Sequence, residues 1–293
     1  MVDCFYCKGK PVIVTDRAMC KKHFIRYFED KVRKTIKQFS LFDRKDKLAI
    51  AASGGKDSTA LLYILHKLGY DVEALAINEG IHGYRDGTLE DLKKICEESK
   101  IKLRIISYKE YFGFTLDELL KQKKFAPCMA CGILRRYLLN RASRDYDRLV
   151  TGHNLDDEAQ SIMMNMMKSN VHLLARLGPK TGQLSDSKFT QRVKPLYLCS
   201  EREVATYAFI KGFPIKFTEC PNASASFRAS IRDFLNDLES KNQGTKIGLV
   251  RSFLKLMPSL KSMPVEKELD HCSGCGEPSS RPICSACSIV GVA

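Results

Sequence analysis

Long apolar segments are absent from this chain, and acidic residues are in deficit. No run reaches the roughly 18 consecutive apolar residues of a membrane-spanning helix. Its first residues include Asp3 and Cys4, where a signal peptide would have a basic start and an apolar core. We therefore expect a cytoplasmic protein with no membrane partner.

The acidic deficit leaves the chain strongly basic. Its 34 Asp and Glu residues face 48 Lys and Arg residues, which gives a net charge of +14 and a pI near 9.2. Folding does not need such an excess, and it suits a polyanionic partner such as a nucleic acid. A generally soluble basic surface is the alternative. The 293 residues suffice for one full α/β domain with smaller appendages.

The spacing of a Walker A loop, Gly-x-x-x-x-Gly-Lys-Ser/Thr, is also absent. Instead, residues 53–58 have the sequence Ser-Gly-Gly-Lys-Asp-Ser, between a predicted strand at 47–52 and a predicted helix at 59–67. The glycines let backbone N–H groups approach an anion, and the helix start adds unpaired donors. An ordinary strand-to-helix turn is the alternative. The six-residue pattern favours a nucleotide-phosphate site.

Predicted strands and helices alternate through the middle of the chain. Further strands are expected at 71–78, 102–107 and 148–154, and helices at 88–99, 133–139, from 155 onward and at 201–212. This alternation predicts an α/β fold built on a parallel sheet with right-handed crossovers. Thr88 and Asp91 have the spacing of a capping box at a helix start. Residues 178–188 are expected to form an exposed loop.

Ligands of parallel sheets bind at the carboxyl ends of the strands. This rule places Asn78, Ser107 and the Ser53 turn on one rim of the predicted sheet. On the strand at 71–78, Ala76 and Ile77 are candidates for the wall that contacts an adenine ring.

Twelve cysteines in a cytoplasmic chain are not expected to form disulfides. Ten of them fall into three spaced groups, and this grouping indicates metal binding. The first and third groups have the ligand spacing of closed, tetrahedral zinc sites. They consist of Cys4, Cys7, Cys20 and His23, and of Cys272, Cys275, Cys284 and Cys287. We expect one structural zinc ion in each, either as a clamp for a large substrate or only as a structural staple.

The second group is Cys128 and Cys131, which open a predicted helix, together with the distant Cys220. A Cys-x-x-Cys pair at a helix start is expected to have at least one lowered thiol pKa. The pair is a nucleophile, a redox pair or a metal clamp, and two buried structural cysteines are the alternative. With Cys220 there are three thiols, one fewer than the four that ligate a 4Fe–4S cluster completely.

Gly152-His153-Asn154-Leu155-Asp156-Asp157 follows the predicted strand at 148–154 and opens another helix. Acidic residues at a helix start often act only as capping groups. The full pattern is more specific than capping requires, and it resembles the second conserved block of PP-loop enzymes that modify tRNA, which implies that Gly152 approaches the nucleotide.

The order of these motifs resembles the tRNA 2-thiouridine synthetases of the PP-loop ATP pyrophosphatase superfamily. This family includes archaeal and bacterial enzymes and the cytosolic eukaryotic thiolation subunit. The resemblance covers essentially the whole chain, including Glu-Cys-Pro at 219–221, and no ligand is missing. It implies the adenine nucleotide alpha-hydrolase-like sheet with helices on both faces and a zinc module at each end. The implied domains are 1–40, 41–217, 218–265 and 266–293.

The resemblance also implies roles for individual residues. The implied ATP-binding residues are Ala52, Ser53, Gly54, Gly55, Asp57, Ser58, Ala76, Ile77, Arg135, Gly152 and Asp157. The implied catalytic residues are Lys56, Cys128, Asp157 and Cys220, with Asp157 near Mg²⁺ and the phosphates or near the reacting base. Cys128, Cys131 and Cys220 are the implied ligands of a 4Fe–4S cluster whose open iron presents hydrosulfide.

The implied reaction is adenylation of the uracil C2 oxygen by ATP, followed by attack of sulfur on C2. A persulfide on Cys128 that Cys220 resolves is an alternative to the cluster. The implied partners are tRNA, a ubiquitin-like sulfur carrier or free sulfide, and a second copy of the chain. The wobble uridine is the expected target, and a T-loop uridine is the alternative. Rival interpretations are tRNA 2-thiocytidine synthesis and a non-catalytic zinc-ribbon module that binds nucleic acid.

Overall fold

The computed structural model describes residues 3–122, 124–182, 186–214, 220–222, 227–264 and 269–291. The expected domain boundaries at 217/218 and 265/266, and Glu219 of the Glu-Cys-Pro motif, lie outside the described residues. Within that part of the chain, no helix is both long and apolar enough to span a membrane.

The N-terminal half contains most of the sheet and the helices of its first crossovers. Its elements are β1 (Pro11–Val14), β2 (Ala18–Cys20), α1 (Lys21–Gln38), β3 (Lys47–Ala51), α2 (Lys56–Lys67), β4 (Asp71–Asn78), α3 (Arg85–Glu98), β5 (Lys102–Ser107), α4 (Tyr108–Phe112), α5 (Leu116–Leu120) and α6 (Pro127–Ala142). The C-terminal half contains β6 (Arg148–Thr151), α7 (Leu155–Met167), α8 (Val171–Leu174), β7 (Arg192–Val193), α9 (Glu201–Lys211), α10 (Phe227–Lys241), α11 (Thr245–Lys261), β8 (Asp270–His271), β9 (Pro278–Ser279) and α12 (Ser285–Val290).

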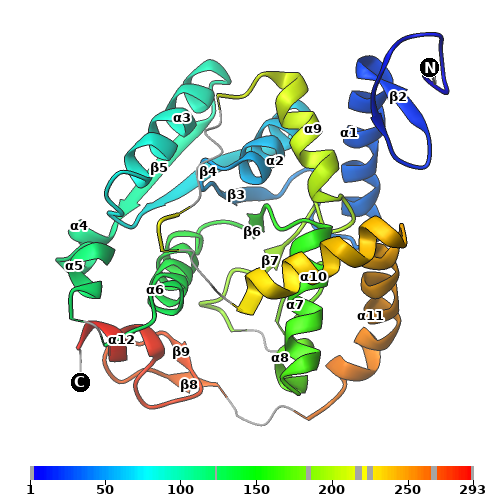
Figure 1. Cartoon of the computed structure of the whole chain (residues 1–293). Coiled ribbons are helices and arrows are strands. Elements are labelled where there is room, and N and C mark those ends of the chain that lie inside the picture. Colours follow the sequence, from blue (N-terminus) through cyan, green and yellow to red (C-terminus); the bar gives the residue numbers. More distant parts are fainter. Residues whose placement is uncertain are drawn as a thin grey trace.

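Five of these strands form one parallel sheet in the order β5-β4-β3-β6-β7, which confirms the predicted α/β fold (Figure 1). The predicted strands at 71–78 and 102–107 match β4 and β5 to the residue. Side chains alternate between the two faces of a strand. On β4, Ala74 and Ala76 therefore pack into the large core with α1, α2, α3 and α9, whereas Leu75 faces the side that α6 covers.

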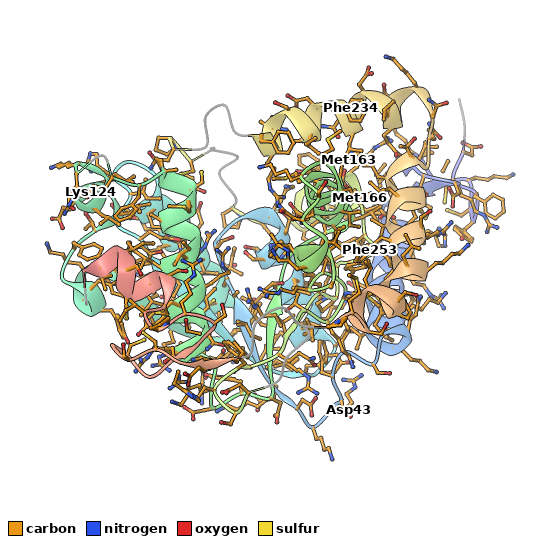
Figure 2. All side chains as sticks on the ribbon, turned by 90° about the horizontal axis from the view of Figure 1, so that it is seen from below. Asp43, Lys124, Met163, Met166, Phe234 and Phe253 are labelled. Atoms are coloured by element: carbon orange, nitrogen blue, oxygen red, sulfur yellow. The ribbon has the colours of Figure 1, made fainter. Side chains whose placement is uncertain are left out.

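Two smaller units extend this sheet domain. The α10–α11 hairpin packs on α7 and α8, where Phe253 is buried and Met163 packs beside it; Met166 and Phe234 lie toward the surface of this unit (Figure 2). The C-terminal segment with α12 packs on α6, at the far end of the molecule from the N-terminus (Figure 1). α1 is part of the large core through its apolar stripe, including Phe28 and Val32.

Two local predictions are wrong. α3 begins at Arg85, not at Thr88, and Thr88 lies within the helix, where its hydroxyl donates to the Arg85 carbonyl oxygen and accepts from the Arg85 guanidinium. A side-chain contact within the helix thus replaces the predicted capping box. In the expected exposed loop, Gly178 and Pro179 are buried, and Lys180 pairs with Val193 of β7.

Candidate active site

The Ser53 turn joins β3 to α2 at the carboxyl edge of the sheet, as predicted. Gly54 has a φ of +80°, and a Cβ atom there would lie 2.2 Å from the Thr88 carbonyl oxygen, so only glycine fits. The buried Ser58 hydroxyl lies 3.1 Å from the Ser53 backbone N and 3.1 Å from the Gly55 carbonyl oxygen. These contacts hold the turn open beside the unpaired N–H groups of α2. It is a preformed anion cradle.

The turn after β6 packs directly against this cradle. A Cβ atom on Gly152 would lie 2.9 Å from the backbone N of Ser58, so glycine allows the two turns to touch. Asn154 donates through Nδ2 to Asp57 Oδ1 at 2.9 Å and caps α7 by accepting from the N–H groups of Asp156 and Asp157. The Asp157 side chain accepts from the Asn154 N–H and completes a capping box, so the capping interpretation is correct for this acidic residue, while Asn154 also contacts the phosphate turn.

Asp157 and His153 have strongly shifted pKa values in this site. Burial raises the pKa of Asp157 to about 6, while one of its oxygens accepts from the Asn154 N–H at 3.2 Å. Burial, together with the positive charges of Lys194 and Arg228, lowers the pKa of His153 to about 3. At neutral pH His153 is therefore an uncharged imidazole. Its Nδ1 lies 3.0 Å from Thr151 Oγ1.

A cavity of about 390 Å³ lies between this rim and α6. The predicted ATP-binding residues that line it are Ala52, Ser53, Asp57, Ser58, Ile77, Arg135, Gly152 and Asp157. The structure adds lining residues that sequence reasoning did not assign to the site, which include Leu75, Glu79, Arg85, Gly132, Leu139, Leu149, His153 and Arg192. The period of two along β4 could have found Leu75, because it shares a face with Ile77. Ala76 lies on the opposite face, buried in the large core.

Glu79 and Arg85 connect the phosphate turn to α6. Arg85 is buried and pairs with Glu79 at 2.8 Å, and its guanidinium also donates to the backbone oxygens of Ser53 and Ile77. The other oxygen of Glu79 lies 3.6 Å from Arg135 of α6. One buried carboxylate thus positions two cations, one on the nucleotide side of the cavity and one on the cysteine side.

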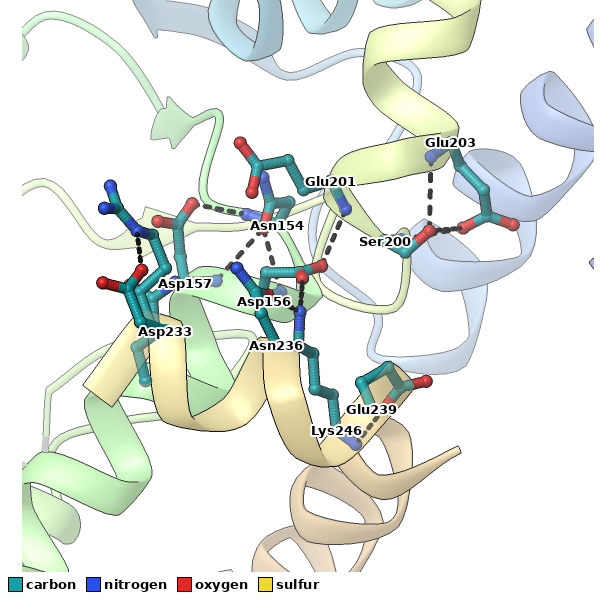
Figure 3. A network of polar contacts seen from close by, with 12 residues as sticks. Asn154, Asp156, Asp157, Ser200, Glu201, Glu203, Asp233, Asn236, Glu239 and Lys246 are labelled. Atoms are coloured by element: carbon teal, nitrogen blue, oxygen red, sulfur yellow. Dashed lines mark hydrogen bonds and ion pairs between the residues drawn. The ribbon is translucent and has the colours of Figure 1, made fainter. Parts of the chain in front are cut away.

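Lys56 does not line the cavity; its ammonium pairs with Glu201 at 2.8 Å and with Asp57 at 3.1 Å. Figure 3 shows how Glu201 is held: its backbone N–H donates to Asp156 at 2.7 Å, and Asp156 pairs with Lys246 of α11. Because Asp156 and Lys246 are largely buried, this network has little freedom to move. The α10–α11 hairpin therefore contributes to the position of Lys56.

Cys128 and Cys131 lie at the start of α6, and the segment that contains Cys220 packs beside them. Pro127 occupies the first turn of the helix, and the Cys128 sulfur lies 3.4 Å from the carbonyl oxygen of Asn222, two residues after Cys220. Cys131 and Cys220 pack in the same apolar cluster. Burial raises the pKa of Cys131, and the expectation of at least one lowered thiol pKa in the pair stays a prediction.

The three sulfur atoms do not all lie within 4.8 Å of one another, unlike the ligand atoms of the two outer groups. Around one zinc ion, sulfurs bound at about 2.3 Å lie about 3.8 Å apart. Cys7 and Cys20 have this spacing, at 3.7 Å, and so do Cys275 and Cys284, at 3.8 Å. The His23 Nδ1 atom lies 3.3 Å from the Cys20 sulfur. The outer groups thus fit single ions, whereas the three central sulfurs are too far apart to form a single-ion site of this kind.

A parallel sheet with a Ser-Gly-Gly-Lys-Asp-Ser cradle at its carboxyl edge defines the class of PP-loop nucleotide-binding proteins. In agreement, the family model of the PP-loop domain matches residues 24–239.

Three relatives show the group within this class. The tRNA-5-methyluridine(54) 2-sulfurtransferase of Pyrococcus horikoshii is 40% identical over 94% of this chain and 88% of its own length. Cytoplasmic tRNA 2-thiolation protein 1 of Danio rerio is 34% identical over 99% of this chain and 88% of its own. The structure of a U34-tRNA thiolase from Methanococcus maripaludis with its 4Fe–4S cluster matches with a TM-score of 0.85 at 34% identity, over 99% of this chain and 95% of that one. The chain belongs to the PP-loop family of tRNA 2-thiolation enzymes.

Proposed function

We propose that this protein is an ATP-dependent tRNA-uridine 2-sulfurtransferase that forms AMP and pyrophosphate. One observation carries the proposal: α6 brings the residues next to its cysteine pair, Gly132 and Arg135, into the cavity that the Ser53 turn and Asp157 also line. Activation by ATP and delivery of sulfur can therefore act on the same base.

The residues of the rim divide the work on ATP. The N–H groups of the Ser53 turn, with the Ser53 and Ser58 hydroxyls, bind the phosphates that leave as pyrophosphate. Lys56 supplies positive charge beside them. The Asp157 carboxylate is the oxygen ligand that Mg²⁺ prefers, next to the phosphates. Ile77 and Leu75 provide the apolar wall for the adenine ring, and His153, being neutral, adds no competing charge.

The cysteines of the central group supply the sulfur chemistry. Cys128, Cys131 and Cys220 would hold a 4Fe–4S cluster, which when bound supplies an iron with an open position for hydrosulfide. A persulfide on Cys128, resolved by Cys220, is the alternative for the same positions. Among the described residues nothing generates sulfide, so the donor for the cluster mechanism is a ubiquitin-like sulfur carrier or free sulfide, whereas the persulfide alternative needs a donor that already carries sulfur at the sulfane level. The two outer groups each hold one Zn²⁺, and we expect a cytoplasmic homodimer.

The target base has two candidates, and each is supported by a relative. The similarity in structure is to an enzyme that acts on U34, and a 40% identical relative is named for position 54. We retain the wobble uridine as the first candidate and the T-loop uridine as the second. Both fit the net charge of +14.

The test is a reaction under anaerobic conditions with ATP, Mg²⁺, sulfide and a tRNA transcript. Nuclease digestion and mass spectrometry then identify the modified residue, and transcripts with cytidine at position 34 or 54 locate it. We expect 2-thiouridine, with one AMP and one pyrophosphate formed per modification, and loss of product only with cytidine at position 34. Loss only at position 54 would select the second candidate. Formation of 2-thiocytidine, or tRNA binding without pyrophosphate release, would contradict the proposal.

A further inference from the structure

Two arginines on the cavity wall, Arg136 of α6 and Arg192 of β7, have no acidic partner among the residues that the structure describes. The other two arginines of the cavity, Arg85 and Arg135, both pair with Glu79. Partial burial, then repulsion from Arg136, lowers the pKa of Arg192. Partial burial, then repulsion from Arg135, likewise lowers the pKa of Arg136. Neighbouring cations without a counterion cost free energy unless an anion binds between them.

Arg192 enters the cavity from the end opposite the Ser53 turn. It pairs in register with Leu149, and Leu149 pairs with Ala49 of β3. Ser53 is four residues beyond Ala49, which corresponds to about 13 Å along the strand direction. The backbone of Arg192 is therefore well below the cradle that binds the ATP phosphates.

Arg136 places its guanidinium next to the cysteine pair. Helical side chains point back toward the N-terminus of their helix. A Cβ atom on Gly132 would lie 3.3 Å from Arg136 Nη1, so the guanidinium lies over this glycine. Gly132 follows Cys131 directly. An anion bound to Arg136 would thus lie beside Gly132, the residue that follows Cys131 of the proposed sulfur site.

We propose that Arg136 and Arg192 form a second phosphate site, which binds the RNA backbone phosphate next to the target uridine. This inference rests on the proposed function. Guanidinium groups bind phosphate oxygens in a bidentate manner. Both arginines are exposed at the cavity, where a polynucleotide backbone can reach them. A nucleotide turned out of the RNA then keeps its phosphate at these arginines while its base extends toward the cysteines.

ATP is the other source of phosphate, and the arrangement favours RNA. The Ser53 turn already offers backbone and hydroxyl donors for the triphosphate, and the strand register places this turn well away from the backbone of Arg192. A triphosphate bound at the Ser53 turn leaves Arg136 and Arg192 without a counterion, whereas the backbone phosphates of the substrate RNA can supply one. The site therefore selects a uridine within an RNA chain and rejects the free nucleoside.

The experiment compares R136Q, R192Q and the double variant with R251Q, which removes the same charge from the exposed face of α11 outside the cavity. For each protein, prepared anaerobically, we would measure tRNA affinity across a salt series and the affinity for ATP. We expect each cavity variant to bind tRNA about tenfold more weakly. The slope of log affinity against log salt should fall by about one per arginine. ATP affinity should be unchanged, as should both affinities in R251Q.

A second arm identifies the phosphate. A short RNA stem-loop with a neutral methylphosphonate next to the target uridine should bind wild type and R136Q equally. This RNA lacks the phosphate charge that Arg136 binds, so the loss of Arg136 has no further effect. The variants R136K and R192K keep the charge and should recover most of the salt slope. Thermal melting of each variant checks that α6 and β7 remain folded.

Three results would overturn the inference: cavity variants that match R251Q, variants that lose ATP affinity but keep the tRNA salt slope, or a methylphosphonate that weakens R136Q as much as wild type. Thiolation of tRNA by the wild-type protein, measured in parallel, tests the proposed function separately. Product formation with normal tRNA affinity in the double variant would remove the phosphate site and leave the sulfurtransferase assignment intact.

Discussion

The two four-ligand modules at the ends of the chain have similar chemistry and different surroundings. At the N-terminal module Cys7 is exposed, and the neighbouring Phe5 is 61% exposed. At the C-terminal module three of the four cysteines are buried, in the same apolar cluster as Cys131 and Cys220. The carboxylate of Glu277 accepts hydrogen bonds from Arg141 of α6 and from Arg144, just beyond the end of this helix.

This difference separates metal binding from the role of the metal. Cysteine spacing indicates an ion in both modules, but only packing shows what each ion supports. The N-terminal module is attached to α1 through Ile13 and Met19, and its ligand Cys7 is exposed to solvent. The C-terminal module holds the helix that carries the cysteine pair. We therefore expect a disturbance of the C-terminal module to reach the active site, and one of the N-terminal module to remain local.

The largest expected effect is that of removing one ligand from each module. Cys284→Ser should lose one zinc, lose the cluster and thiolation, and melt roughly 10 °C lower, because α6 loses a buried support worth a few kcal/mol. Cys7→Ser should also lose one zinc but keep the cluster and ATP binding. Metal analysis, melting curves and product formation measure this. Equal loss of cluster in both variants would break the comparison.

A smaller effect is expected in the rate of metal removal. A chelator reaches the N-terminal ion first, because Cys7 is exposed, whereas Cys272, Cys284 and Cys287 are buried. Zinc release followed with a colorimetric indicator should be biphasic. The fast phase should disappear in Cys7→Ser, and thiolation should decline only with the slow phase. A single phase, or activity lost with the fast one, would show that burial does not distinguish the modules.

The contact between Glu277 and α6 can be tested without touching a metal ligand. Glu277→Gln should destabilise the protein by about 1–3 kcal/mol, because Arg141 and Arg144 lose a buried charged acceptor but remain partly exposed to water. Glu118→Gln is the matched control, since its pair with Lys109 is exposed to solvent and should contribute much less to stability. Chemical denaturation measures both. A control as costly as the test variant would contradict this account of the contact.

The smallest effect should follow from a change at the surface of the N-terminal module. The Arg17 guanidinium lies 4.2 Å from the centre of the Phe5 ring. Arg17→Ala should cost no more than about 1 kcal/mol, as expected of an exposed cation–π contact, and should leave metal content and thiolation unchanged. A loss of thiolation with zinc retained would show that this module takes part in the reaction.

Much of the fold could be predicted because it depends on local patterns. The apolar run of β4, and the change of hydrophobic period between the strands and the helices of the chain, predict the parallel sheet. The sequence of the Ser53 turn predicts the anion site of this sheet. The start of α3 could not be found this way. Thr88 has the spacing of a cap, but the helix begins earlier, at Arg85. Arg85 is buried and contacts Glu79 and the backbone oxygen of Ser53, and the sequence pattern does not show these contacts.

The residues of the candidate site could be predicted where they belong to a sequence motif. They could not be predicted where only the fold brings them to the cavity. Asp157 and Gly152 belong to a recognisable motif, and the structure places both in the cavity. Arg192 lies on a two-residue strand with no local signal, and only its register with Leu149 brings it to the cavity. Likewise, the raised pKa of Cys131 follows from burial, which outweighs the helix-start effect that its sequence position suggests.

The most direct test of the account is the metal content of the anaerobically purified protein. We would count iron, sulfide and zinc per chain and record the absorption spectrum, for wild type and Cys220→Ala. The account predicts two zinc ions and one oxygen-sensitive 4Fe–4S cluster in wild type, with the cluster lost and both zinc ions kept in the variant. Two zinc ions without iron, even after anaerobic reconstitution, would contradict the cluster and leave persulfide chemistry on the same three cysteines.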